Sequence, residues 1–476
     1  MSYAIYVGKN QSSSGHAWLA GYGDEPSSHW LEINPRKQHS PVKTITVGVS
    51  EYADLPGTQT AIPQASETAR NIRVEYSYYK GVPAPVTNGG LNEYGVAVRD
   101  IWSTSRDELI AMTPVNQSGP NYSDLARIVV ERARTAREGV ELIAKLIADF
   151  GESTYGGNSH LIADADEAWV MIQFAGGQGL WAAERLGPDS IRASRPGYIG
   201  IIPIDEPDHP DFLYSSNLIS FARSRGWYAQ GEFDVNSILG DGKGRWDGVQ
   251  WIESEMAKRA ARSEKIGLND IIWAIRTPSL TGDTAGYGQV VPLSNPTHNG
   301  LRFLWHAPIG GLAAPFAPVF MGQNKVPEEF QMHRYLTTGE SHRFMDNRKE
   351  VTGADDTLSK VSQRTEAFRC AVSECKRLLY LMLQNQDRYI PEVVQCFENR
   401  EAIVSRQTKT MVTAASALID QGDESAAFSL LTYFSDNELL SGLELVATLS
   451  ASLEALTKLA GQGDRNASLK MYDQIW

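Results

Sequence analysis

The amino-acid sequence predicts an α+β protein, and three observations carry this prediction. Residues 2 to 100 are rich in β-branched and aromatic residues, and Gly, Pro and Asn interrupt them at the spacing of turns. Between 122 and 150 the apolar spacing becomes helical, and strand-like segments return between 160 and 184. From 355 onward the chain is strongly helical. Runs of strands alternating with runs of helices favour sheets covered by helices over a regular alternation of single strands and helices.

The first twenty-four residues predict a hairpin. Tyr3–Val7 alternates as a strand, residues 8–15 supply turn residues, and residues 16–20 can return as the second arm. Such a hairpin places Ser2 inside a sheet. Asp24 then falls just past the return strand, close enough to hold or orient the amine of Ser2.

The elements that follow are predicted from alternation, capping residues and turn residues. Asn88-Gly-Gly reads as a turn between two strands, and Ser123 with Asp124 reads as a helix cap. The expected strands are 44–49, 72–79, 95–101, 160–163, 168–174 and 180–184, and the expected helices are 122–133, 136–150, 250–262, 355–389, 391–396, 411–421, 426–434 and 439–459. A boundary near 340 would separate a main domain, residues 1–340, from a helical C-terminal region, residues 341–476, that packs on it or on a partner subunit.

Composition excludes several classes of protein. The 476 residues carry 44 basic and 57 acidic side chains, a net charge of −13, and no basic stripe, so we expect no nucleic-acid binding. The three cysteines match neither a redox pair nor a zinc site, and the nine histidines are scattered, so we expect no metal and a reducing, cytoplasmic compartment. No signal peptide and no 18-residue apolar stretch is visible, so we expect no membrane association.

Ser2 is the candidate for chemistry because it stands directly behind Met1. Its side chain is small enough for a methionine aminopeptidase to remove Met1 and leave Ser2 with a free amine. An N-terminal Ser can use its own α-amine as the general base for its hydroxyl. Such an amine titrates near pH 7.7–8.0, so roughly a tenth is unprotonated at pH 7. A positioned base contributes about 10²–10⁴ in rate, which outweighs that loss.

The opening Met1–Asn10, with Gly23-Asp24-Glu25, resembles the dipeptidase A and secernin family of N-terminal nucleophile hydrolases. Further similar segments follow in order over most of the chain: 88–96, 156–164, 167–170, 181–186 and 314–322. The resemblance implies an αββα four-layer sandwich that cleaves a dipeptide or other small amide, with no metal or organic cofactor, in a homo-oligomer. Two positions depart from the family. Ser2 replaces its usual Cys, and Gly21 stands where its members tend to have Arg, so the role of that Arg must be filled by another cation or not at all.

The remaining candidates surround this proposed nucleophile. By position in the family, Asn217 and Arg245 are expected to assist Ser2 and Asp24 in catalysis, with Asn217 or Asn88 as a donor to the oxyanion. The other candidates for substrate binding are Asn88, Arg99, Asp100 and His160. Two alternatives stay open: a non-catalytic binding or scaffold protein on the same fold, favoured by Ser2 and Gly21, and a serine hydrolase that uses an internal Ser.

Overall fold

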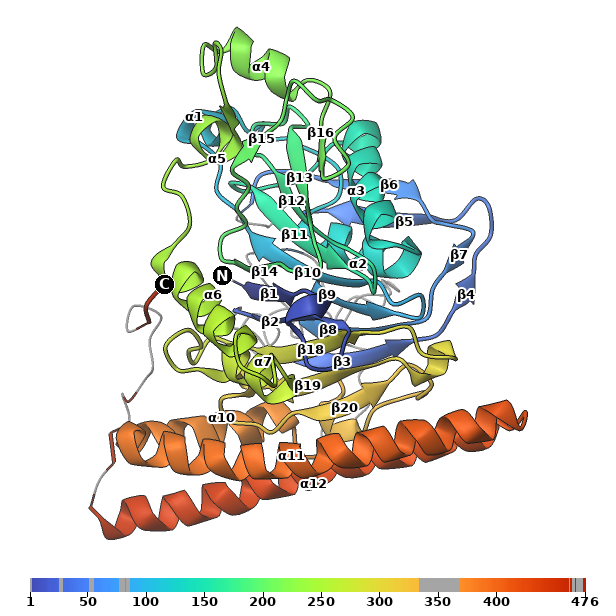
Figure 1. Ribbon diagram of the computed structural model, residues 1–476, viewed down its shortest axis with the longest axis vertical. Coiled ribbons are helices and arrows are strands. Elements are labelled where there is room, and N and C mark those ends of the chain that lie inside the picture. The colour runs from blue at the N-terminus through green and yellow to red at the C-terminus, as the bar shows by residue number, and fades with distance from the viewer. Residues whose placement is uncertain are drawn as a thin grey trace, which may run out of the picture.

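A computed structural model describes residues 2–24, 29–50, 55–76, 82, 86–333, 368–461, 463–464, 467 and 474–476 of the chain. Two antiparallel sheets dominate this part of the molecule (Figure 1). The six-stranded sheet runs in the order β14 (Ile191–Ser194), β1 (Tyr3–Val7), β2 (Ala17–Gly23), β18 (Tyr287–Leu293), β19 (Phe303–Pro308) and β20 (Ala317–Phe320). The eight-stranded sheet runs in the order β16 (Phe212–Tyr214), β13 (Trp181–Leu186), β12 (Ala168–Gln173), β11 (Asn158–Ala163), β10 (Ala97–Trp102), β9 (Val86–Asn92), β8 (Asn71–Tyr76) and β3 (His29–Asn34).

Smaller elements complete the described chain. The paired short strands are β4 (Lys37–Gln38) with β7 (Glu67–Thr68), β5 (Thr44–Gly48) with β6 (Gln59–Pro63), and β15 (Ile201–Ile202) with β17 (Phe233–Asp234). The helices are α1 (Asp107–Ala111), α2 (Tyr122–Arg132), α3 (Ala136–Phe150), α4 (Leu218–Ser224), α5 (Val235–Leu239), α6 (Asp247–Ala260), α7 (Leu268–Arg276), α10 (Ala371–Met382), α11 (Gln386–Asp420) and α12 (Glu424–Leu459).

The alternation of β1 shows how the layers stack. Tyr3, Ile5 and Val7 enter a core shared with α6, α7 and the C-terminal helices, whereas Ala4 and Tyr6 enter the core between the two sheets. The opposite face of the eight-stranded sheet packs on α2 and α3 in a third core. The order of layers is therefore helices, sheet, sheet, helices, so the α+β prediction and the four-layer sandwich implied by the resemblance are both confirmed.

The turn predicted at Asn88-Gly-Gly is wrong, because these residues lie inside β9. A Cβ atom on Gly89 would lie 2.1 Å from the carbonyl oxygen of Val98, and one on Gly90 would lie 2.0 Å from that of Ile72. Gly89 also has a φ of 116°. The glycines therefore allow neighbouring strands to approach and distort β9 next to Asn88.

The cap predicted for α2 is displaced by two residues. Asn121 is the N-cap, since its side chain accepts hydrogen bonds from the amides of Ser123 and Asp124. Asp124 in turn accepts from the amide of Asn121, which completes a capping box. The α3 helix has the predicted limits and ends at Gly151, whose φ of 80° suits glycine.

Among the described residues, the C-terminal helices divide differently from the prediction. The helix expected at 355–389 is interrupted at Leu383–Asn385, between α10 and α11. The segments expected at 391–396 and 411–421 belong to the single helix α11, which contains Pro391, and those expected at 426–434 and 439–459 belong to α12. Both helices bury side chains at helical spacing along their length, so tertiary packing overrides the local breaks. The part of the predicted helix at 355–389 up to residue 367, and the boundary near 340, lie outside the described residues.

The sequence-based expectation about apolar stretches needs one correction. Among the helices that the structure describes, α12 is long and apolar enough to cross a membrane by length and composition. Its inner face packs on the six-stranded sheet, with Leu431, Leu439 and Leu443 buried in the cores. Of the apolar window in α12, 33% is buried inside the protein.

Candidate active site

Ser2 lies at the start of the second strand of the six-stranded sheet, next to its edge strand β14. It precedes β1, which pairs with β14 on one side and β2 on the other. Its side chain is only 5% exposed. Because Ala4 and Tyr6 face the eight-stranded sheet, the alternation of β1 directs Ser2 toward that sheet as well.

The facing sheet brings Asn88 to Ser2. The Nδ2 atom of Asn88 lies 3.4 Å from Oγ of Ser2, and 3.5 Å from Oδ2 of Asp100 on the neighbouring strand. Asn88 is 1% exposed. An amide donor this close to the attacking hydroxyl also lies close to the oxygen of any carbonyl that the hydroxyl attacks.

Asp24 follows β2 and forms a buried ion pair with Arg195, which follows β14. Nη2 of Arg195 lies 3.1 Å from Oδ2 of Asp24, and the Thr284 hydroxyl donates to the other carboxylate oxygen. Burial raises the pKa of Asp24, but the positive charges of the chain's N-terminus and of Arg195, with the Thr284 hydrogen bond, outweigh burial and lower this pKa overall. Asp24 therefore carries a negative charge at neutral pH, just past the end of the strand that pairs with β1.

Sequence reasoning did not find Arg195 or Thr284. With Gly21 in place of the family's Arg, either another cation or none was expected, and Arg195 is a cation in contact with Asp24. Arg195 also donates from Nη1 to the hydroxyl oxygen of Tyr22, at 2.7 Å. In the sequence, the weak indication that Arg195 could belong to the site was its position directly after a strand, in Ser194-Arg195-Pro196.

Asp100 and His160 form a buried pair behind Asn88. The two residues are directly opposite each other on β10 and β11, and Nε2 of His160 lies 3.7 Å from Oδ1 of Asp100. Nε2 also donates to the carbonyl oxygen of Tyr122, and Nδ1 lies 3.0 Å from the side-chain oxygen of Gln173. Burial lowers the pKa of His160 to about 4, so the ring is neutral at physiological pH. This arrangement makes His160 a support for Asp100.

Arg99 points to the opposite face of β10 from Asp100. Its neighbours Ala97 and Ile101 lie in the core between the sheets, on the side that Ser2 faces. The guanidinium is 1% exposed, and within the described part of the chain its Nε and Nη2 atoms have no hydrogen-bond partner. Burial lowers the pKa of Arg99, although the nearby Tyr287 opposes this shift.

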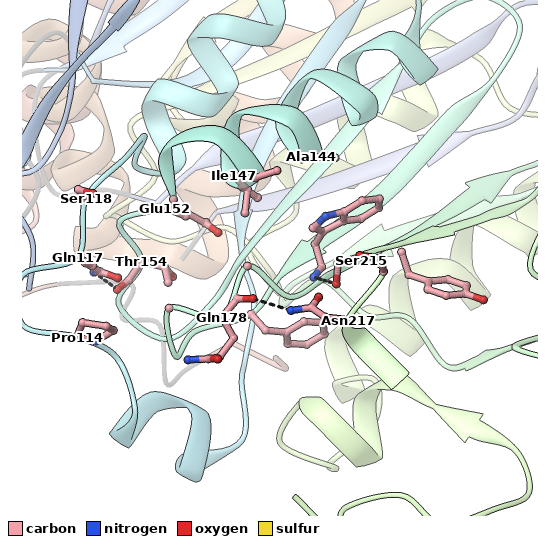
Figure 2. Close-up of a pocket in the computed structure, with 18 of the residues that line it drawn as sticks. Pro114, Gln117, Ser118, Ala144, Ile147, Glu152, Thr154, Gln178, Ser215 and Asn217 are labelled. Carbon is pink, nitrogen blue, oxygen red and sulfur yellow. Dashed lines mark hydrogen bonds between the residues drawn. The ribbon is translucent and has the colours of Figure 1, made fainter. Parts of the chain in front are cut away.

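The structure does not bring Asn217 or Arg245 to Ser2. Asn217 is exposed, and its Nδ2 atom donates to the carbonyl oxygen of Gln178 at the rim of a cavity of about 810 Å³ that Ser2 does not line (Figure 2). Arg245 forms an ion pair with Glu253 at the start of α6. The catalytic roles that family position suggested for Asn217 and Arg245 therefore stay predictions, whereas the contacts at Ser2 and Asp24 come from Asn88 and Arg195.

These residues together can support acyl transfer. Ser2 supplies a hydroxyl and, once Met1 is removed, an amine, while Asp24 can hold that amine and Asn88 can donate to an oxyanion. Among the described residues, no group of three or more His, Cys, Asp or Glu side chains is placed to bind a metal ion.

Comparison with known proteins gives a family and several relatives. Residues 3–245, just over half of the chain, match the model of peptidase family C69. Probable dipeptidase A of Streptococcus pyogenes serotype M3 (strain SSI-1) is 25% identical over 224 residues, which cover 46% of this chain and 44% of the relative. Probable dipeptidase B of Streptococcus pyogenes serotype M3 (strain ATCC BAA-595 / MGAS315) is 30% identical over 171 residues, which cover 34% and 33%. The chain thus matches less than half the length of these relatives.

Among solved structures, a mutant of conjugated bile acid hydrolase from Clostridium perfringens aligns over 67% of this chain and 92% of its own, with 10% identity and a TM-score of 0.30. The segment 314–322, which resembles the dipeptidase A and secernin family in sequence, lies beyond residues 3–245 that match the family model. The length of the family match determines the assignment: this chain is a member of peptidase family C69.

Proposed function

We propose that this chain is an amidohydrolase of the dipeptidase type, with Ser2 as its nucleophile and the α-amine of Ser2 as its base. The observation that carries the proposal is the contact between Ser2 and Asn88, at 3.4 Å, in a buried site where Asp24 lies just past the end of the strand that pairs with β1. The names of the curated relatives, probable dipeptidases A and B, support a small peptide as substrate.

The mechanism follows from the roles of these groups. The amine of Ser2 takes the hydroxyl proton as Oγ attacks the amide carbonyl, and the Asn88 amide donates to the resulting oxyanion. The protonated amine then gives its proton to the leaving nitrogen, and an ester to Ser2 remains. A water molecule attacks this ester with the same amine as base, which releases the acid and restores the hydroxyl. Asp24 keeps the amine oriented throughout.

Arg99 supplies the charge that a dipeptide would need. A dipeptide carries a carboxylate at one end, and Arg99 is a buried cation without a carboxylate partner among the described residues, in the layer that Ser2 faces. A guanidinium binds a carboxylate through two parallel hydrogen bonds. We therefore place the terminal carboxylate of the substrate at Arg99.

The test begins with the intact mass of untagged protein, with and without a fluorophosphonate probe. The proposal expects Met1 to be absent and a single adduct to map to Ser2. A panel of dipeptides should then be hydrolysed by the wild type and by Ser2→Cys, but not by Ser2→Ala or by protein that retains Met1. Full turnover by protein whose mass shows an intact Met1 would refute the mechanism. Hydrolysis by Ser2→Ala would indicate an internal serine, and an inert wild type would favour the binding or scaffold alternative.

A further inference from the structure

Trp476 lies against the residues that support Ser2, although the two are far apart in sequence. The indole ring centroid is 5.3 Å from that of Tyr3, the residue next to Ser2. The guanidinium carbon of Arg195 lies 4.4 Å from the centre of the same indole. Figure 1 shows the two ends of the described chain, marked N and C, on the same side of the molecule near α6.

The segment ending at Trp476 is held by specific contacts. Nε1 of Trp476 donates to the carbonyl oxygen of Leu280 at 2.8 Å, and the amide of Ile475 donates to that of Ser279 at 3.1 Å. Gly248, in the first turn of α6, leaves room for the indole. A Cβ atom there would lie 2.6 Å from Cε3 of Trp476 and 2.9 Å from its Cα atom.

The same contacts join Trp476 to Asp24. Tyr22 donates its hydroxyl hydrogen to the carbonyl of Leu280, which also accepts from Trp476, and the Tyr22 oxygen accepts from Arg195. Arg195 in turn holds Asp24. We propose that Trp476 is a positioning residue of the active site, whose indole keeps the Arg195 guanidinium against Asp24 and so controls how strongly Asp24 holds the amine of Ser2. This inference rests on the proposed function.

The physical basis is competition for one carboxylate. Arg195 binds Asp24, and in the mature chain that the proposed function requires the protonated amine of Ser2 would compete for the same carboxylate, so a firmly held Arg195 would weaken the attraction between Asp24 and the ammonium group. Among the described residues, the Thr284 hydroxyl and the Tyr22 phenol also face Asp24, and burial raises the pKa of that phenol so that it stays neutral. The carboxylate of Asp100 contacts Asn88, which lies between it and Ser2 in the chain of contacts.

Loss of the indole should raise the pKa of the Ser2 amine. A cation over the face of a Trp ring is attracted by the negative face of the ring, and that attraction disappears in Trp476→Ala. Arg195 then competes less for Asp24, the ammonium form of Ser2 is favoured, and the pKa of the amine rises. Because the base must be unprotonated, the acidic limb of kcat/KM should move to higher pH by about 0.5–1 unit.

The experiment compares pH profiles of kcat/KM for wild type, Trp476→Ala, Trp476→Phe and Gly248→Ala. Trp476→Ala should shift the acidic limb upward, Trp476→Phe should restore most of the wild-type profile, and Gly248→Ala should shift it as well because its methyl group displaces the indole. The matched control is Trp273→Ala, which removes another Arg–Trp stack, with Arg259 at 3.5 Å. This control should lower the thermal midpoint without moving the limb.

A second readout needs no turnover. In protein labelled with ¹³C-serine, the resonance that is missing from Ser2→Ala reports the titration of the Ser2 amine, and its midpoint should rise in Trp476→Ala. The inference would be overturned if both Trp476→Ala and Gly248→Ala leave two quantities unchanged: the acidic limb of the kcat/KM profile and the titration midpoint of the Ser2 amine. This holds even if Ser2→Ala is inactive. Activity in Ser2→Ala refutes the proposed function instead, and the two failures are therefore distinct.

Discussion

The contact between Asn88 and Ser2 gives the most direct prediction about catalysis. Asn88→Ala removes a buried amide whose Nδ2 atom lies 3.4 Å from Oγ of Ser2. One preorganised donor to an oxyanion contributes about 2.7–4 kcal/mol, so kcat should fall by about 10²–10³. The donor acts on charge that develops only in the transition state, so KM should change little.

The chain offers a matched control in its other candidate Asn. Asn217 is exposed and donates to Gln178, so Asn217→Ala should leave kcat within about twofold of the wild type, as expected for a surface substitution. Steady-state kinetics on a dipeptide, normalised by titration of Ser2 with an acylating probe, measures both variants. A raised KM with unchanged kcat in Asn88→Ala would refute the role in the transition state. An equal loss in Asn217→Ala would restore the assignment suggested by family position.

Two further predictions concern stability, and urea unfolding measures both. Glu401→Ala leaves the Arg276 guanidinium, 3% exposed, without its carboxylate in the core between α7 and α11, and should cost about 3–5 kcal/mol. Glu392→Ala, which breaks an exposed pair on α11, should cost less than about 1 kcal/mol, and equal losses would contradict the burial argument. Burial raises the pKa of Glu152 to about 8, above its value in the unfolded chain, so stability should fall as pH rises from about 4.5 to 8. Glu152→Gln should remove part of this decline. The free energy of unfolding of this variant should exceed that of the wild type by about 1–2 kcal/mol at pH 8 but not at pH 4. Parallel curves of unfolding free energy against pH for the two proteins would exclude the effect.

Local signals in the sequence were sufficient for much of the fold. The limits of α3 were predicted correctly, because Gly151 ends the helix through a backbone conformation that glycine favours. The alternation of Tyr3–Val7 was also correct, since one strand with two buried faces must divide its side chains between two cores. The lengths of α11 and α12 were wrong, because contacts between the helices outweigh Pro391 and the other local breaks.

The site was harder to predict because its contacts cross long stretches of sequence. Asn88 and Asn217 are equivalent as sequence signals, and only the packing of one sheet on the other distinguishes them. Arg195 meets Asp24 across a sequence separation of 171 residues. Trp476 reaches the same cluster from still farther along the chain, and periodicity carries no information about such a contact.

The place of β1 between β14 and β2 sets an order of events in the life of the chain. Ser2 is almost fully buried once β14 and β2 flank β1, and β18 then extends the sheet beyond β2. A methionine aminopeptidase needs the first peptide bond to be extended and accessible, so it must act before these strands come together. Because β18 begins at Tyr287, more than half of the chain has to be synthesised before that sheet can close. If Ser2 acts as proposed, Met1 has to be removed from the nascent chain on the ribosome, and a chain that folded first would keep Met1 and lack the proposed base.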